Sequence, residues 1–518
     1  MLGKSGSGGP AQAGGLPHFM SNRISHTIAL ICAAMVLAFT VVHRMLETPL
    51  WNYNGSRLMP SFALAHGINY YVLMPPGGPL YNSLYGPLVA LVYLPATLFS
   101  TPNSAVLGGS AITVLLCFGA AAIVHFTPSK TARGSVDVLA FLTLGFLMCY
   151  LEPLKYSCFN IHADGPGLAL GAVACAVLYS GGALPVSALC AVLAIFCKQT
   201  FLPVPIALVV YVWARDGRTR ALRYLLWLVA AGVLAGGVAL VAAGPARLYH
   251  CLIWIPAHHP WNDASRIVSA IQAMRSFIRV SMPVPVLLLA CVVYAGYNRS
   301  TLRALLASRS APLLLAGIAL LPFSIAGRAK AGGDVNSLSF ALFFLTCGLT
   351  VLLADVARDA QNPPARRLAL AVLVAMMLPL AVSEGPLTLD IPASVRRLPR
   401  APQEVAFEYL NRHPGEAYFP WFPLAHYYAE HQFRHYAFGI ADRLLAGEAV
   451  SEEDFRAYTP RDPRVIAFAA DGTPQLFGYD LMKYLPEYRY QVSDLQLPGW
   501  LVYSGRPERP PQAEGLPH

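Results

Sequence analysis

The sequence predicts an all-α polytopic membrane domain followed by a small extracytoplasmic α/β domain at the C-terminal end. The 518 residues are 56% hydrophobic and only 12% charged, whereas a soluble domain carries about 25% charged residues. The apolar residues gather in long runs over residues 26–390. From about residue 396 these runs stop, and helix-like and strand-like patterns alternate up to about residue 510.

The apolar runs have the length that a membrane crossing requires. A helix needs roughly 20 apolar residues to cross about 30 Å of hydrocarbon, and backbone facing lipid must be helical to satisfy its amides. Clear runs occur at 28–42, 104–124, 135–151, 222–243, 282–297, 311–326, 337–354 and 368–383. Runs that are short or broken by Pro and Gly occur at 86–100, 164–180, 184–197 and 200–214. We therefore expect about 11 to 13 spans.

The arginines predict the orientation of these spans. Much of the net charge of +10 comes from loops 215–223, 298–310 and 355–367, which pairs of runs separate. Positive residues mark cytoplasmic loops, so we expect these loops inside and the chain after residue 384 outside. Residues 1–25 are expected to form a disordered cytoplasmic tail before a retained signal anchor. Loops on the two sides of the membrane must alternate along the chain. With the N-terminus inside, this order requires that 86–100 is re-entrant or shallow, or that another span is divided wrongly.

Two further readings of the composition are not favoured. The basic loops lack aromatic stacking residues, so we expect no nucleic-acid partner. Most of the ten cysteines lie in apolar runs, where Cys behaves as a small hydrophobic residue. No CxxC spacing occurs, and no Cys follows residue 396, so a disulfide framework is not expected.

The first outer loop, residues 44–85, holds one candidate carboxylate. Glu47 precedes every other acidic residue in the chain and is flanked by Arg44 and Arg57. A carboxylate at the membrane edge is a candidate general base, although an ion-paired interfacial residue fits the same pattern.

Within the same loop, residues 57–66 are expected to form a short helix on the membrane surface. Its apolar residues Leu58, Phe62 and Leu64 are expected to face lipid. The PPGGP and YGP stretches that follow end helical structure and turn the chain back.

The second outer loop, residues 152–165, supplies Asp164 at the start of an apolar run. Asp is a common helix N-cap that the helix dipole favours, so a structural role and a catalytic role both remain open. His162 precedes it closely, and the two side chains are suited to share a proton or a metal. Two candidate ligands do not define a metal site, so none is assigned, and a divalent metal remains an open possibility for the reaction.

Cations are expected on the same outer face. Lys198, followed by Gln199, lies at the junction of two short apolar runs, and loop 327–336 adds Arg328 and Lys330. Ionisable residues at this depth are functional candidates, and cations there suit a lipid-linked phosphate. The alternative is that these side chains snorkel to lipid headgroups.

Aromatic and histidine-rich segments give weaker indications. In WIPAHHPWND, Trp254 and Trp261 fit either a membrane-interface belt or a platform for sugar rings. In HYYAEHQFRH, His431 and His435 lie one helical turn apart, which leaves a zinc site or an aromatic outer surface. The C-terminal domain is expected to contain a helix at 402–412 and strands within 416–422, 464–470 and 499–505.

Four segments carry a family likeness by their order in the chain. They are ALAHGINYY…GPLYNSLYGPLVALVYLP, HADGPGLALG, KQTFLPVPIAL and GRAKAGGDVNSL, within about residues 25–355. Their order resembles the GT-C class of membrane glycosyltransferases. Among these, the chain is similar to polyprenyl-phosphate-sugar-dependent enzymes such as lipid A aminoarabinose and galacturonic acid transferases and protein O-mannosyltransferases.

The resemblance implies a polyprenyl-phosphate-linked sugar as donor, membrane lipids around it, and a glycan, lipid or protein acceptor at the periplasmic face of a bacterial inner membrane. It also implies a catalytic acid in the first outer loop, where this chain has Asn52 and Asn54. The base role then falls to Glu47 or Asp164, unless the chain binds the lipid-linked sugar without transferring it. The residues expected to bind substrate are Asn52, Asn54, Arg57, His162, Lys198, Gln199, Arg328 and Lys330, of which Lys198, Arg328 and Lys330 would hold the donor phosphate.

The expected function is therefore an inverting glycosyltransferase that uses a lipid-phosphate sugar. A polyprenyl-linked glycan transporter or flippase is one alternative, but it would need polar residues through the membrane and often internal repeats. An outer-face glycan polymerase or ligase is another, and strict dependence on a monophosphate-linked monosaccharide would separate it from the first reading.

Overall fold

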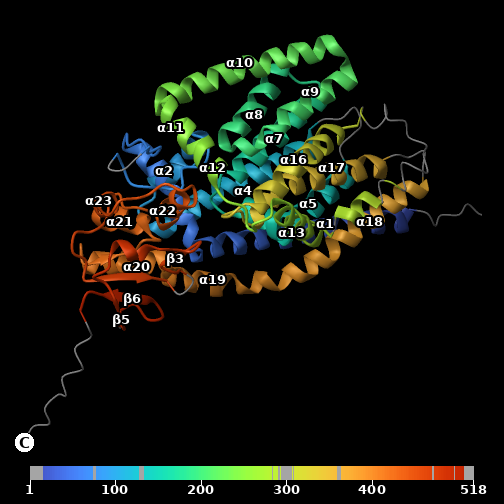
Figure 1. Cartoon of the computed structure of the whole chain (residues 1–518). Helices are drawn as coiled ribbons and strands as arrows, with labels where there is room; N and C mark the ends of the chain where they lie inside the picture. Colours follow the sequence, from blue (N-terminus) through green and yellow to red (C-terminus); the bar gives the residue numbers. More distant parts are fainter. Residues whose placement is uncertain are drawn as a thin grey trace, which may run out of the picture.

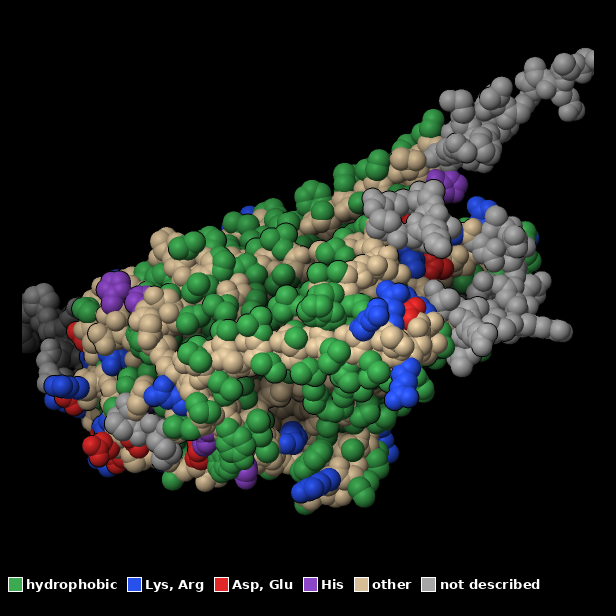
Figure 2. Space-filling model, turned by 90° about the horizontal axis from the view of Figure 1, so that it is seen from above, with side chains coloured by type: hydrophobic (Ala, Val, Ile, Leu, Met, Phe, Trp, Pro, Cys, Tyr) green, Lys and Arg blue, Asp and Glu red, His purple; other side chains and the backbone are tan. Residues whose placement is uncertain are grey.

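The computed structural model describes residues 16–506, apart from 74–76, 128–133, 283, 290–291, 293–305, 307, 359–362, 470–471 and 495. The helices form an elongated bundle, and the C-terminal elements gather at one end of it, next to α2 (Figure 1). Apolar side chains cover much of its long flank in Figure 2, whereas charged side chains collect toward the ends.

The chain is an integral membrane protein. Six helical stretches in the described residues are long and apolar enough to cross a membrane. They are Ile24–Leu50, Pro102–Phe126, Arg218–Ala243, Ala311–Ala329, Val335–Arg358 and Pro363–Arg412. The pair α5 (Ser135–Tyr150) and α6 (Glu152–Phe159), bent by 93°, is a seventh if counted as one span. Shorter helices complete the bundle, and run 282–297 lies partly outside the described residues, so the total of about 11 to 13 spans remains a prediction.

The remaining membrane-domain elements include helices in the expected runs and shorter helices in the loops between them. They are α1 (Leu16–Glu47), η1 (Thr48–Leu50), α2 (Asn52–Ala65), α3 (Leu88–Val92), η2 (Leu94–Leu98), α4 (Pro102–Phe126), α7 (Asp164–Tyr179), α8 (Leu184–Cys197), η3 (Gln199–Phe201), α9 (Pro203–Asp216), α10 (Arg218–Ala243), α11 (Pro245–Tyr249), η4 (His250–Trp254), α12 (Ile255–His258), α13 (Arg266–Val280), α16 (Ala311–Ala329), η5 (Val335–Leu338), α17 (Ser339–Arg358), α18 (Pro363–Glu384), η6 (Gly385–Asp390), α19 (Ile391–Arg397) and η7 (Leu398–Arg400). Helix α1 begins inside the expected N-terminal tail, whose residues 1–15 lie outside the described part.

The run at 86–100 contains no membrane-crossing helix. It forms only α3 and η2, and the amide of Gly86 donates to the carbonyl of Cys197 at 3.0 Å. Two short turns of helix cannot cover about 30 Å of hydrocarbon, which favours the shallow alternative.

Residues at or next to the ends of α5, α16 and α17 meet in one ion-pair network. The Arg309 guanidinium lies 2.7 Å from an oxygen of Asp355 and 3.5 Å from one of Asp137. Arg358 pairs with the same two carboxylates. The ends of α5, α16 and α17 are thereby joined.

The C-terminal domain is a small α/β unit, as predicted. Its four-stranded sheet has the order β1-β2-β6-β5, with β1 parallel to β2 and the other pairs antiparallel. A separate hairpin pairs β3 with β4. The elements are α20 (Pro402–Arg412), β1 (Ala417–Tyr418), α21 (Pro423–Glu430), α22 (Ala437–Leu445), α23 (Glu452–Ala457), β2 (Val465–Phe468), β3 (Gln475–Leu476), β4 (Tyr479–Asp480), η8 (Leu481–Tyr484), β5 (Tyr490–Val492) and β6 (Leu501–Ser504).

The sequence predicted that the apolar face of α2 lies against lipid, but the structure buries this face inside the protein. Leu58 is 0% exposed and Phe62 is 1% exposed, and Leu64 is partly buried in the same core. The ring of Phe62 lies 4.8 Å from that of Tyr427 in α21. The expectation was wrong because the C-terminal domain covers the apolar face of α2.

Candidate functional site

A cavity of about 450 Å³ lies where the membrane domain meets the C-terminal domain. Its walls come from α2, α6, the loop before α3, the loop before η5, α22 and the β3–β4 hairpin. A narrower pocket of about 30 Å³ adjoins it. The two share Arg57, Asn82, Tyr85 and His162 as lining residues.

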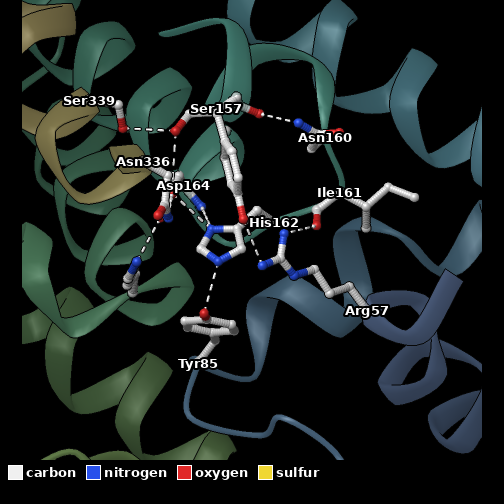
Figure 3. A network of polar contacts seen from close by, with 12 residues as sticks. Arg57, Tyr85, Ser157, Asn160, Ile161, His162, Asp164, Asn336 and Ser339 are labelled. Carbon is white, nitrogen blue, oxygen red and sulfur yellow. Dashed lines mark hydrogen bonds and ion pairs between the residues drawn. The ribbon is translucent and has the colours of Figure 1, made fainter. Parts of the chain in front are cut away.

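Asp164 is the centre of the polar network beside this cavity (Figure 3). It is 0% exposed and is the first residue of α7. One oxygen lies 2.8 Å from the Lys198 ammonium. The other accepts from Asn336 at 2.6 Å and from Ser157 at 3.3 Å, and lies 2.8 Å from Nδ1 of His162.

These four contacts bear on the two roles expected for Asp164. A carboxylate has about four acceptor sites, and side chains outside the helix terminus fill them, so the side chain does not act as an N-cap. Asp164 is also absent from the cavity lining. Its position suits a residue that orients His162 and Lys198, which do line the cavity.

His162 presents its second ring nitrogen to the cavity wall. We assign the ring proton to Nδ1, because Nδ1 lies 2.8 Å from the Asp164 carboxylate and 3.3 Å from the Asp164 amide. Nε2 then accepts from the Tyr85 hydroxyl at 2.8 Å. Burial lowers the pKa of His162 to about 3, while Asp164 opposes this shift. The imidazole is therefore neutral, with a lone pair that points away from the carboxylate.

Two cations line the cavity in different ways. Lys198 is paired with Asp164 and lies 4.7 Å from the ring centre of Phe340. Arg57 donates to the Tyr156 hydroxyl at 2.8 Å and lies 5.2 Å from the ring centre of Trp51. Within the described residues, no carboxylate lies within ion-pairing distance of Arg57. A partly buried charge without an opposite partner favours an anionic ligand.

Asn52 and Asn54 of the first outer loop are buried and do not line the cavity. The Asn54 amide donates to the carbonyl of Thr48 at 2.8 Å and to Asn160 at 2.9 Å. Its oxygen accepts from the amide of Ile161 at 2.9 Å. Asn54 thus clamps the segment that leads into His162, and Asn52 lies at the start of the same helix.

Glu47 lies apart from this network. Its carboxylate accepts from Arg397 at 2.7 Å and from Ser394 at 2.9 Å, and it is not among the cavity-lining residues. The contacts match the ion-paired alternative and tie the end of α1 to α19.

Three further predicted binding residues support the walls without lining the cavity. Gln199 donates to the carbonyls of Leu84 and Leu252. Arg328 donates to the carbonyl of Gly333 at 2.8 Å, and Lys330 to that of Pro256 at 2.7 Å. Arg328 therefore holds the cavity-lining Gly333, and Lys330 ties the same loop to α12.

Sequence reasoning missed several residues that the fold brings to the site. Tyr85 and Asn336 both lie inside segments that carried the family likeness, but their side chains gave no separate signal. Ser157, which also bonds Ser339 at 2.8 Å, comes from α6. Phe438 and Phe477 arrive from the C-terminal domain, far away in sequence.

The histidine-rich segments do not form a metal site in the part of the chain that is described. No group of three or more His, Cys, Asp or Glu side chains there is arranged to hold a metal ion. His435 accepts from the amide of Leu80 at 2.8 Å. The ring of Trp254 stacks on His250 and His258 and does not line the cavity.

The architecture has a counterpart among solved structures. In fold, the chain is similar to ArnT. The crystal structure of ArnT from Cupriavidus metallidurans in the apo state gives a TM-score of 0.55 at 13% identity, covering 94% of this chain and 98% of that one. The same protein bound to undecaprenyl phosphate gives 0.54 at 14% identity, covering 93% and 98%.

The likeness to ArnT, a GT-C glycosyltransferase, confirms the predicted resemblance at the level of the fold. It extends over nearly the whole length of both chains, so it includes the C-terminal domain as well as the membrane helices. No family model matches the sequence, and no curated protein does.

Proposed function

We propose that this chain is a membrane glycosyltransferase that moves a sugar from a polyprenyl-phosphate donor to an acceptor hydroxyl at the outer, periplasmic face of an inner membrane. The observation that carries the proposal is the buried Asp164–His162–Lys198 cluster beside a cavity that also contains Arg57. The fold shared with an ArnT that binds undecaprenyl phosphate supports the same donor class.

In the proposed reaction, the acceptor oxygen attacks the anomeric carbon and the bond from that carbon to the phosphate oxygen breaks. The hydroxyl proton passes to Nε2 of His162, in the place where the Tyr85 hydroxyl donates in this structure. Asp164 stabilises the imidazolium through Nδ1. Attack from the side opposite the phosphate would invert the configuration.

Arg57 and Lys198 are proposed to hold the phosphate. The leaving polyprenyl phosphate gains negative charge as the bond breaks, and fixed cations at the wall stabilise that charge. This assignment moves the phosphate site from Arg328 and Lys330, which hold a loop, to Arg57, which has no carboxylate partner in the described part of the chain.

The test is transfer of radiolabelled sugar from polyprenyl-phosphate donors to membrane acceptors. We expect His162→Gln and Asp164→Asn to lower kcat about 100-fold or more, because the base or its orientation is lost. Glu47→Gln is the matched control, since it also turns a carboxylate into an amide, and near-normal transfer is expected.

The opposite results are equally informative. If Glu47→Gln abolishes transfer at normal expression and His162→Gln does not, the base assignment is wrong. If the wild type transfers no sugar with donor and acceptor extracts varied, a binding or transport role replaces the enzyme proposal.

A further inference from the structure

The β3–β4 hairpin has a phenylalanine at a backbone position that usually takes Asn, Asp or Gly. Phe477 has φ 49° and Gly478 has φ 83°. A two-residue hairpin turn with positive φ at both positions strongly favours Asn-Gly, Asp-Gly or Gly-Gly. A bulky side chain in the left-handed region is an outlier, and such outliers gather at ligand sites.

The ring of Phe477 is held in place yet remains accessible. It lies 5.3 Å from the ring of Phe438, nearly perpendicular to it. The residue is still 43% exposed and lines the large cavity together with Leu476. The strained turn therefore holds an aromatic ring at the cavity instead of burying it in the domain core.

Phe477 begins a continuous row of rings along the cavity wall. Phe438 lies 5.5 Å from Tyr53, Tyr53 lies 4.8 Å from Trp51, and Trp51 lies 4.9 Å from Tyr156, between ring centres. All of these residues line the cavity. The row ends beside the chemistry, because the Tyr156 ring lies 6.0 Å from that of His162.

We propose that Phe477 and Phe438 form a subsite for a sugar ring, so that the C-terminal domain contributes directly to substrate recognition. A sugar ring has C–H groups that pack on aromatic faces, and hydroxyls around its edge that need polar partners. The same cavity offers Asn82, Asn262 and Asp334 for those hydroxyls. Among the described residues the buried side-chain oxygen of Asn82 has no hydrogen-bond partner, and a purely hydrocarbon chain would leave it unpaired.

This inference rests on the proposed function and adds what the outer end of the cavity recognises. The ring bound there belongs either to the donor's own sugar or to a glycan acceptor. Both have the same chemistry, and the experiment separates them.

The experiment measures binding to the full-length protein in lipid nanodiscs with three kinds of probe. These are a short-chain polyprenyl phosphate, the same lipid carrying a hexose, and a panel of free oligosaccharides. Phe477→Asn removes the ring but keeps a residue that tolerates the left-handed turn. We expect it to weaken binding of a sugar-bearing probe roughly ten-fold, with the sugarless phosphate unchanged.

Two controls separate recognition from folding. Phe477→Trp keeps an aromatic ring and should retain sugar binding. Phe323→Ala removes an equally exposed phenylalanine, 43%, that does not line the cavity, and should leave every probe unaffected. Arg57→Gln should weaken both phosphate-bearing probes alike.

The outcomes assign the subsite or overturn it. Weaker binding of the hexose-bearing lipid alone assigns the ring to the donor, and weaker binding of oligosaccharides alone assigns it to the acceptor. Unchanged sugar binding by Phe477→Asn, equal weakening of the sugarless phosphate, or no sugar binding by the wild type overturns the subsite. Sugar binding without any transfer overturns the proposed function and leaves the subsite standing.

Discussion

The charges around Asp164 are arranged so that one carboxylate fixes two neighbours. It pairs with Lys198 through one oxygen and with His162 through the other. Asn336 and Ser157 donate to the same oxygen as His162. The other oxygen depends on Lys198, so the ammonium cannot turn away without leaving a buried acceptor unpaired. Asp164 thus sets the tautomer of His162, the proposed base, and the position of Lys198, which is proposed to hold the phosphate.

At the same scale, replacing Asn54 with an acidic residue is predicted to destabilise the protein. Asn54→Asp would point carboxylate oxygen at the carbonyl of Thr48 and at Asn160, which now accept from the amide. In a site that is 0% exposed, we expect destabilisation of about 3 kcal/mol or more. Thermal midpoints and sugar transfer in matched membranes measure this, and a more active Asn54→Asp enzyme would contradict it.

The sequence predicted the types of residue at the site better than their roles. Lys198, His162 and Asp164 were identified because polar groups next to apolar runs are conspicuous. The roles of these three residues depend on contacts with Asn336 and Tyr85. Asn336 and Tyr85 are far apart in the chain, so such contacts leave no periodic pattern in the sequence. Asn54 looked like a missing acid because its three hydrogen bonds cannot be read from composition.

At the scale of elements, α22 and the loop before α3 hold the two domains together. The amide of Tyr436 donates to the carbonyl of Leu80 at 3.0 Å, and the amide of Leu80 donates to His435 at 2.8 Å. In the C-terminal domain, sequence patterns indicated α20 and the strands β1, β2 and β6, since these follow local periodicity. They did not give this docking, which joins segments more than 300 residues apart and buries the face of α2 expected in lipid.

Gly439 is predicted to be essential for this docking. A Cβ atom there would lie 2.6 Å from the carbonyl oxygen of Leu80 and 2.7 Å from the carbonyl carbon of Tyr81. Because both are backbone atoms, Gly439→Ala must push α22 away and move Phe438 out of the cavity wall. We expect a loss of about 1–3 kcal/mol and reduced transfer, measured by thermal midpoint and activity.

Gly237→Ala in α10 is the matched control for this helix substitution. A Cβ atom at Gly237 would meet nothing within 4 Å, so stability should be unchanged or slightly higher. Equal stability and activity of the wild type and Gly439→Ala would show that the contact with Leu80 does not constrain the domains.

His435 is predicted to make the docking sensitive to acid. Burial lowers its pKa to about 4, from an ordinary value of 6.5. The unfolded chain therefore binds a proton between these values that the folded protein does not, so stability is full above pH 6.5 and falls toward pH 4. The loss amounts to roughly 3 kcal/mol at the acid end.

The measurement compares thermal midpoints of the wild type and His435→Asn from pH 7 to pH 4. The variant keeps a hydrogen-bond acceptor at position 435 but has no titratable side chain there. The thermal midpoint of the wild type should therefore fall more steeply with falling pH. Parallel curves for the two proteins would rule out His435 as the titrating group.

At the scale of the whole molecule, the ion-pair network and the cavity lie in different parts of the chain. The arginine–aspartate network of Arg309 and Arg358 joins the helix ends at one end of the bundle. The cavity and the C-terminal domain lie where the loops predicted to face outward meet. A donor held in lipid and an acceptor arriving from water would meet at such a boundary.

This separation predicts opposite labelling of two introduced cysteines. Ser451→Cys in the C-terminal domain should react with a membrane-impermeant maleimide on cells whose outer membrane is opened. Arg220→Cys at the start of α10 should react only after the inner membrane is permeabilised. The unsubstituted protein gives the background from its native cysteines, and labelling of both positions from the same side would refute the proposed orientation.

The hairpin of Phe477 also has a pharmacological consequence. Part of the cavity wall belongs to the C-terminal domain, which is predicted to face water, and the tip of its hairpin includes a side chain that is 43% exposed. An antibody fragment or cyclic peptide that binds this tip would cover the part of the cavity wall formed by Phe477, without entering the lipid phase.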